Sequence, residues 1–145
     1  MVGNANETLS SETKKAIHCF TFDSKALYDS LDPELVKEAM MFAMNSSRPE
    51  WSEELKIWLL SLIDFSLKAS VAKYEDSWYK QKNGVPTGGS LCVQLANITV
   101  FYVMNKKVYS QPHMMRFVNE IKRFIDDGVG FFYGTEDQFK YWMQL

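Results

Sequence analysis

The protein has 145 residues, of which 46% are hydrophobic and 14% aromatic, so the composition predicts a folded domain with a real core and excludes a disordered chain. The formal net charge of −2 argues against a free-standing nucleic-acid-binding protein, which would carry an excess of basic residues. No apolar run is long enough to cross a membrane, and Cys19 and Cys92 are too few to predict a zinc site or a disulfide framework, so we expect a reduced, intracellular protein.

The first half of the chain predicts a strand followed by two helices. Residues 1–14 begin with the polar run MVGNANETLSS, which is not a signal peptide, so we expect a loose segment before one domain over residues 15–145. Residues 15–23, KAIHCFTFD, predict a buried strand that ends on Asp23. Asp32 and Pro33 are typical of a helix start, and the SSRPE segment at residues 46–50 ends this helix.

Ser52 and the two glutamates after it begin a second, longer helix. Its apolar stripe, at helical spacing, is assigned to the core: Leu55, Trp58, Leu59, Leu62, Ile63 and Leu67. Residues 71–74 and 78–81 predict a β-hairpin, and the glycine-rich residues 83–90, NGVPTGGS, cannot form regular structure. An apolar helix over residues 91–108, a second hairpin and a last helix after Thr135 complete the chain. This order of elements indicates an α+β domain with an antiparallel sheet flanked by helices.

The second hairpin carries two adjacent carboxylates, Asp126 and Asp127, inside the segment IKRFIDDGVGFFYG at residues 121–134. Two β-prone runs around an Asp-Gly turn predict a hairpin with both acids at its tip. Such neighbours repel each other unless a proton or cation lies between them, and Mg²⁺ is the usual hard cation for oxygen ligands. A solvated turn would explain the pair as well, so the interpretation depends on partners elsewhere in the chain.

Asp23 supplies the missing partner, because it ends a predicted strand of the same sheet. Carboxylates delivered by neighbouring strands can hold two Mg²⁺ ions ~4 Å apart, the arrangement used for in-line phosphoryl transfer. The glycine loop between these acids would let the backbone approach a nucleic-acid strand or base pair, where a Cβ would obstruct it. For Gly88 and Gly89 a simple turn that leads into the helix is the alternative.

These segments resemble the palm of reverse transcriptases. FTFDSKALYDSL, residues 20–31, is similar to the first catalytic motif of that family, with Asp23 as a metal ligand. FIDD, residues 124–127, is similar to the third motif, with Asp126 as the principal ligand and Asp127 as its neighbour. QKNGVPTGGSLCVQLANITV, residues 81–100, resembles the second motif. Its matching residues, which the resemblance places at the substrates, are Gln81, Gly84, Pro86, Gly88 and Asn97.

The resemblance covers residues 19–145 and implies an incomplete enzyme. The second motif of the family usually has Ser-Pro where this chain has Cys92 and Val93. The basic fingers motifs would lie before residue 15, and the primer grip and thumb after Leu145, so we expect a palm fragment of a larger polymerase polypeptide that is inactive in isolation. Fingers and thumb normally supply much of the positive channel, which accounts for the acidity of this chain.

By resemblance the protein is an RNA-directed DNA polymerase of a retroelement, closer to non-LTR, Penelope-like or intron-type elements than to retroviruses. It would extend a DNA primer on an RNA template with deoxynucleoside triphosphates, using two Mg²⁺ ions, or Mn²⁺ as a substitute, on the three aspartates. Tyr28, five residues after Asp23, would be a steric gate against the ribose 2′-hydroxyl, although a tyrosine packed in the core is the alternative. An RNA-dependent RNA polymerase usually has an acid at that position, which argues against this rival. An inactive, domesticated palm with a structural or binding role is the other alternative.

Two pairs of basic residues have no assigned role. Lys106 with Lys107, and Lys122 with Arg123, could contact phosphate, but paired surface bases are more often solvated. His18 and His113 are interpreted as packing or surface residues rather than metal ligands.

Overall fold

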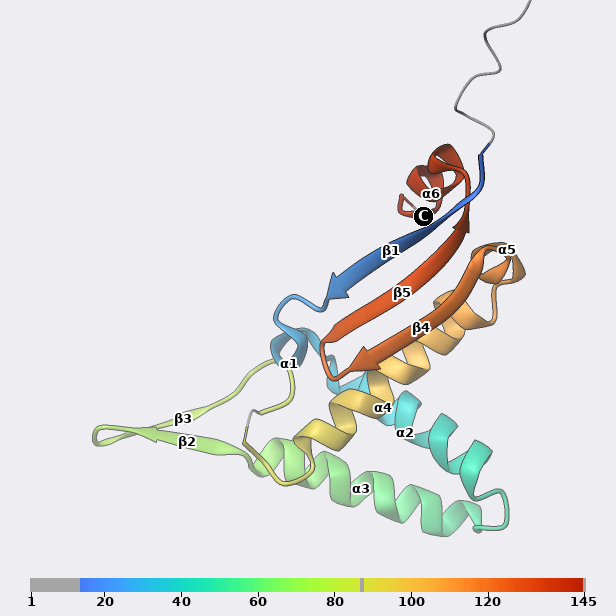
Figure 1. The fold of residues 1–145 in the computed structure, drawn as a ribbon. Helices are drawn as coiled ribbons and strands as arrows, with labels where there is room; N and C mark the ends of the chain where they lie inside the picture. Colours follow the sequence, from blue (N-terminus) through green and yellow to red (C-terminus); the bar gives the residue numbers. More distant parts are fainter. Residues whose placement is uncertain (1–13, 87, 145) are drawn as a thin grey trace, which may run out of the picture.

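The computed structural model describes residues 14–86 and 88–144, and it contains a sheet, a group of helices and a projecting hairpin (Figure 1). The loose segment predicted for residues 1–14 lies outside the described residues except for Lys14. Both sheets are antiparallel, and helices flank the main one, so the predicted α+β class is confirmed.

The main sheet has three strands in the order β1–β5–β4, with β5 in the centre. Strand β1 spans Ala16–Asp23, β4 spans Val118–Phe124 and β5 spans Asp127–Gly134. Strand β1 forms where it was predicted, but only Phe20 in it is buried, and Ile17 is 71% exposed. The prediction of a buried strand is therefore wrong, because β1 is an edge strand and the described residues leave one of its faces open.

Two phenylalanine–glycine pairs join β1 to β5. The register places Phe20 opposite Gly130 and Phe22 opposite Gly128. A Cβ added to Gly130 would lie 2.3 Å from the ring of Phe20, and one added to Gly128 would lie 2.0 Å from the ring of Phe22. Each ring therefore covers the backbone of its glycine, and a larger residue would displace it.

The predicted helices begin at the predicted capping residues. The Ser52 hydroxyl accepts a hydrogen bond from the Leu55 N–H (3.3 Å), and Thr135 forms a reciprocal capping box with Gln138. Asp32 occupies its predicted N-cap position, although its side chain makes no cap hydrogen bond there. The helices are α1 (Leu27–Ser30), α2 (Pro33–Ser47), α3 (Glu53–Ala69), α4 (Cys92–Met104), α5 (Pro112–Met115) and α6 (Glu136–Trp142).

Three helical segments differ from the prediction. The short helices α1 and α5 were not predicted, since each is a single turn without a periodic apolar pattern. The helix predicted to reach residue 108 ends as an α-helix at Met104 and continues as a π-helix over Asn105–Tyr109. None of the helices that the structure describes is long and apolar enough to span a membrane.

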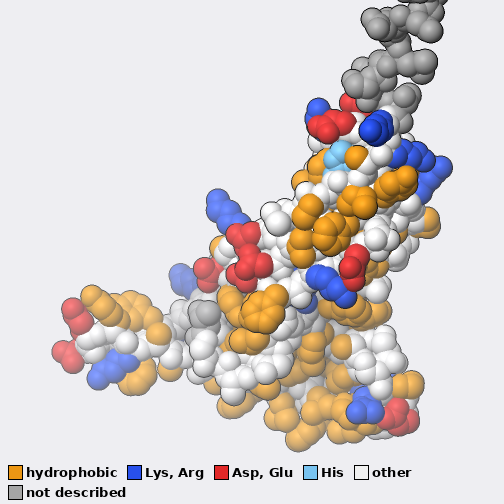
Figure 2. Space-filling model, viewed as in Figure 1, with side chains coloured by type: hydrophobic (Ala, Val, Ile, Leu, Met, Phe, Trp, Pro, Cys, Tyr) orange, Lys and Arg blue, Asp and Glu red, His pale blue; other side chains and the backbone are white. Residues whose placement is uncertain are grey.

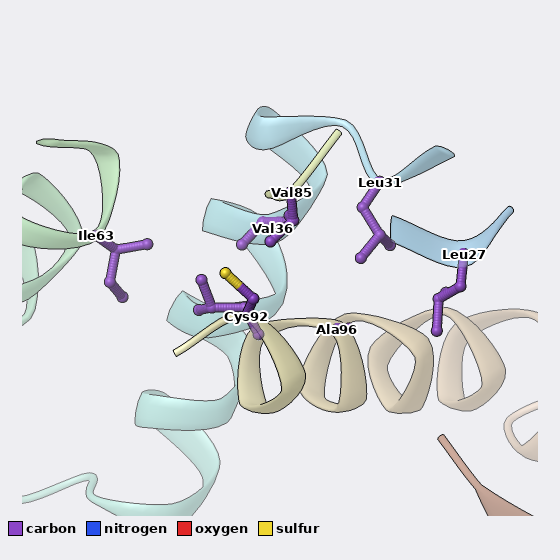
Figure 3. Close-up of a cluster of buried hydrophobic side chains, with 8 residues drawn as sticks. Leu27, Leu31, Val36, Ile63, Val85, Cys92 and Ala96 are labelled. Atoms are coloured by element: carbon purple, nitrogen blue, oxygen red, sulfur yellow. The ribbon is translucent and has the colours of Figure 1, made fainter. Parts of the chain in front are cut away.

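The main core lies between α1, α2, α3, α4 and the glycine-rich loop (Figure 3). Its buried members are Leu27, Leu31, Val36, Ile63, Val85, Cys92, Leu95 and Ala96. Val85 belongs to the loop and is fully buried beside Val36 of α2. The loop that was interpreted as a substrate-binding element is therefore anchored in the core by its own side chain.

A second apolar cluster joins α6 to the sheet. Phe132 is fully buried in β5, and its ring centroid lies 5.4 Å from that of Phe139 and 5.6 Å from that of Trp142, both on α6. His18 stacks on Phe139 with a centroid distance of 4.8 Å, and its Nε2 lies 3.2 Å from the Gly134 carbonyl oxygen. This environment agrees with the interpretation of His18 as a packing residue.

Only part of the apolar stripe of α3 belongs to the core, which corrects the prediction that all of it does. Ile63 is buried, but Trp58 is 57% exposed, and Leu55 and Leu62 are also exposed. Apolar side chains accordingly form a large part of the surface at the lower edge of the molecule, where α3 lies (Figure 2). The helical spacing identified residues that share a face, but the described residues cover only part of that face.

The first hairpin consists of β2 (Val71–Tyr74) and β3 (Ser77–Lys80), and it projects from the rest of the protein (Figure 1). It confirms the predicted hairpin, although its second strand begins one residue earlier than predicted. All eight strand residues are exposed. The hairpin leads directly into the glycine-rich loop and so carries Gln81 at its base.

Candidate active site

Asp23 and Asp127 lie directly opposite each other at one end of the main sheet. Asp23 is the last residue of β1, Asp127 is the first residue of β5, and their Cα atoms are partners in the register. The N–H of Ser24 donates a hydrogen bond to the carbonyl oxygen of Asp126 (3.1 Å), so the third acid is adjacent. Figure 2 shows acidic side chains gathered over this end of the sheet. The structure thus pairs Asp23 with Asp127 and places Asp126 in the adjoining turn.

The pair formed by Asp23 and Asp127 fits a hard divalent cation. Residues directly opposite in an antiparallel pair point to the same face, with Cβ atoms roughly 4.5–5.5 Å apart. Both side chains are exposed, so their carboxylates can turn toward a shared ion. Within the described residues, no three His, Cys, Asp or Glu side chains are already grouped to hold a metal. A two-ion site therefore stays a prediction.

The turn before Asp127 differs from the predicted Asp-Gly turn. Phe124 pairs with Asp127, so the two loop residues are Ile125 and Asp126. Gly128 lies within β5, where it accommodates the ring of Phe22 rather than a bend of the chain. The register also places Asp127, and not Asp126, opposite Asp23, whereas the resemblance makes Asp126 the principal ligand.

Ile125 has φ +55°, a left-handed conformation that is a genuine outlier for a β-branched residue. The guanidinium of Arg123 donates hydrogen bonds to the Ile125 carbonyl oxygen and to Asn97 Oδ1 (3.0 Å), and Nη2 donates to the Asn97 carbonyl oxygen (3.1 Å). The sequence alone predicts that Arg123 is solvated or contacts phosphate. The described structure instead has it half-buried between the turn and α4.

The neighbouring base, Lys122, has a different environment. It is exposed and lies 2.9 Å from a carboxylate oxygen of Glu120. The hydrogen bond that the Lys122 ammonium group donates to the Glu120 carboxylate raises the pKa of Lys122. Lys122 is thus a surface charge, as the commoner interpretation predicted, whereas Arg123 is not.

Gly84 packs against protein and not against open space. Its φ is +77°, and an added Cβ would lie 2.4 Å from the carbonyl oxygen of Tyr28 and 2.7 Å from Cα of Asp29. The N–H of Val85 donates a hydrogen bond to the same Tyr28 oxygen (2.8 Å). Close packing against α1 is therefore sufficient reason for a glycine at this position, and the predicted contact of Gly84 with nucleic acid stays a prediction.

Gly88 and Gly89 differ: the surroundings of Gly88 leave room for contact with nucleic acid, whereas those of Gly89 agree with a simple turn that leads into the helix. Gly88 has φ +95°, and among the described residues no atom other than those of its chain neighbours lies within 4 Å of an added Cβ, so there is space beside its backbone. An added Cβ on Gly89 would lie 2.6 Å from Sγ of Cys92, which agrees with a turn that leads into α4. Gln81 is exposed and Pro86 is half-buried, and their predicted contacts with substrate stay predictions.

Tyr28 and Asn97 both have structural contacts that the sequence did not reveal. Tyr28 is half-buried in α1, packs against the main core, and binds the loop through its carbonyl oxygen. Asn97 accepts hydrogen bonds from Arg123 through both of its oxygens. The predicted gate at Tyr28 and the predicted substrate contact of Asn97 stay predictions.

The fold is similar to that of telomerase. A solved structure of apo telomerase from Candida tropicalis matches 91% of this chain with a TM-score of 0.68 and 17% identity. Apo telomerase from Candida tropicalis truncated from the C-terminal domain matches 88% with a TM-score of 0.64 and 18% identity. The chain spans 26% of each telomerase chain, and at this identity the likeness shows the fold alone.

Comparison with known protein families finds no match, and no curated protein matches the chain. Telomerase, the enzyme in both of these solved structures, is a reverse transcriptase. No match supports a retroelement type, which therefore remains a prediction from sequence.

Proposed function

We propose that the chain is the palm region of an RNA-directed DNA polymerase and forms part of a larger polypeptide. The observation that carries the proposal is the position of Asp23 opposite Asp127, with Asp126 in the adjoining turn. The similarity to telomerase supports it, since telomerase is a reverse transcriptase and part of its chain has a similar fold. The substrates would be an RNA template, a DNA primer and deoxynucleoside triphosphates, and the element would be a retroelement.

Asp23, Asp126 and Asp127 would hold Mg²⁺, with Mn²⁺ as a substitute. Bound Mg²⁺ would lower the pKa of the primer 3′-hydroxyl and neutralise the leaving pyrophosphate. The chain itself contributes negative charge at a fixed place, because the register determines which carboxylates meet. The open backbone at Gly88 would contact the nucleic acid, while Gly84 and Val85 would hold the loop against Tyr28.

Divalent metal is expected to stabilise the chain through these carboxylates, and this experiment tests the proposal. At a metal concentration ten times the dissociation constant, the melting temperature should rise by about 3–6 °C, because the cation relieves repulsion between the acids and binds only the folded state. Thermal unfolding followed by circular dichroism, with and without Mg²⁺ or Mn²⁺, measures the shift.

The substitutions Asp23→Asn and Asp127→Asn should each abolish that rise. Asp76→Asn is the matched control, because Asp76 is an exposed acid in the turn of the projecting hairpin. A rise that survives Asp23→Asn and Asp127→Asn, or that disappears with Asp76→Asn, would show that the metal binds elsewhere and would remove the basis of the proposal.

Tyr28 is expected to exclude ribonucleotides by the bulk of its ring. In the complete polymerase, Tyr28→Ala should raise the insertion of ribonucleotides relative to deoxynucleotides roughly tenfold or more, a change of about 1.4 kcal/mol. Single-nucleotide insertion with both sugars measures the ratio, and Tyr28→Phe, which keeps the ring, should leave it unchanged. If the ratio stays constant in Tyr28→Ala while deoxynucleotide insertion persists, Tyr28 is a core residue and the RNA-polymerase alternative gains support.

A further inference from the structure

Arg123 lies on the face of the sheet opposite to the acidic pair. Its partner in the register is Gly128, next along β5 to Asp127, and successive residues of a strand point to opposite faces. Its guanidinium therefore lies under the sheet, toward α4, where all three acceptors are uncharged oxygens of Asn97 and Ile125. This placement directs the donors away from the face on which nucleic acid would meet the carboxylates.

The turn that Arg123 holds is strained. A β-branched residue rarely adopts a positive φ, and such a conformation persists only where its surroundings fix it. The turn is fixed from two sides, because Arg123 binds the carbonyl of Ile125 and the N–H of Ser24 binds the carbonyl of Asp126. Losing one of these two contacts would let the turn relax, and Asp126 and Asp127 would move with it.

The other end of the contact is rigid. Asn97 follows Leu95 and Ala96 of α4, which are buried in the main core, and precedes Thr99, which is also buried. Arg123 engages Asn97 through its side chain and its backbone at once, so the guanidinium fork is fixed in direction as well as in distance. The position of the acidic turn is thereby tied to the helix that follows the glycine-rich loop.

Apart from the contact between Arg123 and Asn97, a cavity separates much of the main sheet from α4. That contact is therefore more important for holding the two layers together. An apolar cavity of about 520 Å³ lies between them, and its lining includes Phe20 and Ile121 from the sheet and Val100 and Val103 from α4. Where close packing does not hold two layers in place, a polar contact between them has more influence on their separation.

We propose that Arg123 is a positioning residue, which fixes the Ile125–Asp126 turn to Asn97 of α4 and so holds the acidic residues in the place where they bind metal. Its catalytic consequence rests on the function proposed above, whereas its structural consequence does not. Residues that do not bind the metal themselves but orient its ligands typically lower the metal affinity roughly 10–100-fold when they are removed. A phosphate-binding arginine would instead act mainly through the binding of nucleotide or nucleic acid.

Hydrogen exchange of the Ser24 amide tests the structural part, because this amide donates to the carbonyl of Asp126 and so reports on the turn. Arg123→Met and Asn97→Ala should each speed its exchange roughly tenfold or more at a pH and temperature where the chain stays folded. The double variant should add little beyond the effect of Arg123→Met, since the side-chain hydrogen bond that Asn97→Ala removes is already absent in Arg123→Met. Arg48→Met, at an exposed arginine after α2, is the control and should change nothing.

Metal binding and kinetics test the functional part. The affinity for Mn²⁺ should fall roughly tenfold or more in Arg123→Met. Arg123→Lys keeps the charge but lacks the fork, so it should not restore the affinity. In the complete polymerase, kcat should fall while KM for the deoxynucleoside triphosphate changes much less.

The outcomes separate this proposal from the proposed function. Unchanged Ser24 exchange in both single variants, additive effects in the double variant, or full recovery with lysine would overturn the positioning role. If Arg123→Met does not fold, Asn97→Ala decides through the same amide. If Ser24 exchange responds as expected but no variant, including the unmodified chain, binds Mn²⁺, the positioning role stands and the polymerase proposal fails.

Discussion

Asp23→Asn is expected to lower primer extension by the complete polymerase at least about a thousandfold, equal to about 4 kcal/mol of transition-state stabilisation. An amide keeps the size of the carboxylate but removes the negative charge that would hold a divalent ion opposite Asp127. Because the substitution leaves the strand pairing intact, circular dichroism in the absence of metal should change little. The melting temperature without metal should not fall, since the amide removes the repulsion between Asp23 and Asp127. Rates of single-nucleotide insertion measured under single-turnover conditions give the size of the effect.

Measuring the same insertion rates for Asp126→Asn and Asp127→Asn shows which of the two adjacent acids matters more. The resemblance to reverse transcriptases predicts the larger loss for Asp126→Asn, whereas the register of β1 and β5 gives Asp127 the position opposite Asp23. Asp76→Asn again serves as the control and should keep full activity. Activity within tenfold of the unmodified enzyme in Asp23→Asn would place the reacting carboxylates elsewhere and contradict the proposed function.

Gly84→Ala is expected to lower the free energy of unfolding of the chain by about 3 kcal/mol. The new Cβ would lie 2.4 Å from the Tyr28 carbonyl oxygen, and φ +77° is unfavourable for alanine in any surroundings. The loop would have to move away from α1, which would disturb the hydrogen bond from Val85 to Tyr28 and the burial of Val85. Urea unfolding followed by circular dichroism measures the difference.

Gly88→Ala is the matched control for this substitution. Gly88 has a similar φ of +95°, but an added Cβ there would meet no atom of the described residues within 4 Å, its chain neighbours aside. It should therefore lose only about 1 kcal/mol, the effect of the backbone conformation alone. Equal losses at the two positions would show that the close approach of Gly84 to α1 is not what makes the glycine necessary.

The elements with local signals were predictable from sequence. Pro33 at the start of α2, the hydroxyl of Ser52 and the capping box of Thr135 each act within one helical turn, so the chain near them determines the outcome. The exposure of Trp58 was not predictable in this way. Helical periodicity shows which residues share a face, but the element that covers the face is determined by the rest of the fold.

The candidate site likewise contains features with local sequence signals and features that depend on distant contacts. The acids could be identified because their spacing and flanking residues resemble known motifs. The contact of Arg123 with Asn97 joins residues 26 positions apart, on a strand and a helix, and no local pattern marks it. The predicted position of the turn between β4 and β5 is wrong for a similar reason. Gly128 is typical of a turn residue in the sequence, and only its pairing with Phe22 shows that it lies within β5.

The phenylalanine–glycine pairs of β1 and β5 also determine how the acidic pair forms during folding. A slip of one residue would set Phe20 against Val129 or Phe131, and a slip of two would leave only one ring opposite a glycine. One alignment alone accommodates both rings, and in that alignment Asp23 meets Asp127. Steric exclusion at the neighbouring Phe22–Gly128 and Phe20–Gly130 pairs thus brings two like charges together, and the apo protein can assemble its acidic site before any cation arrives.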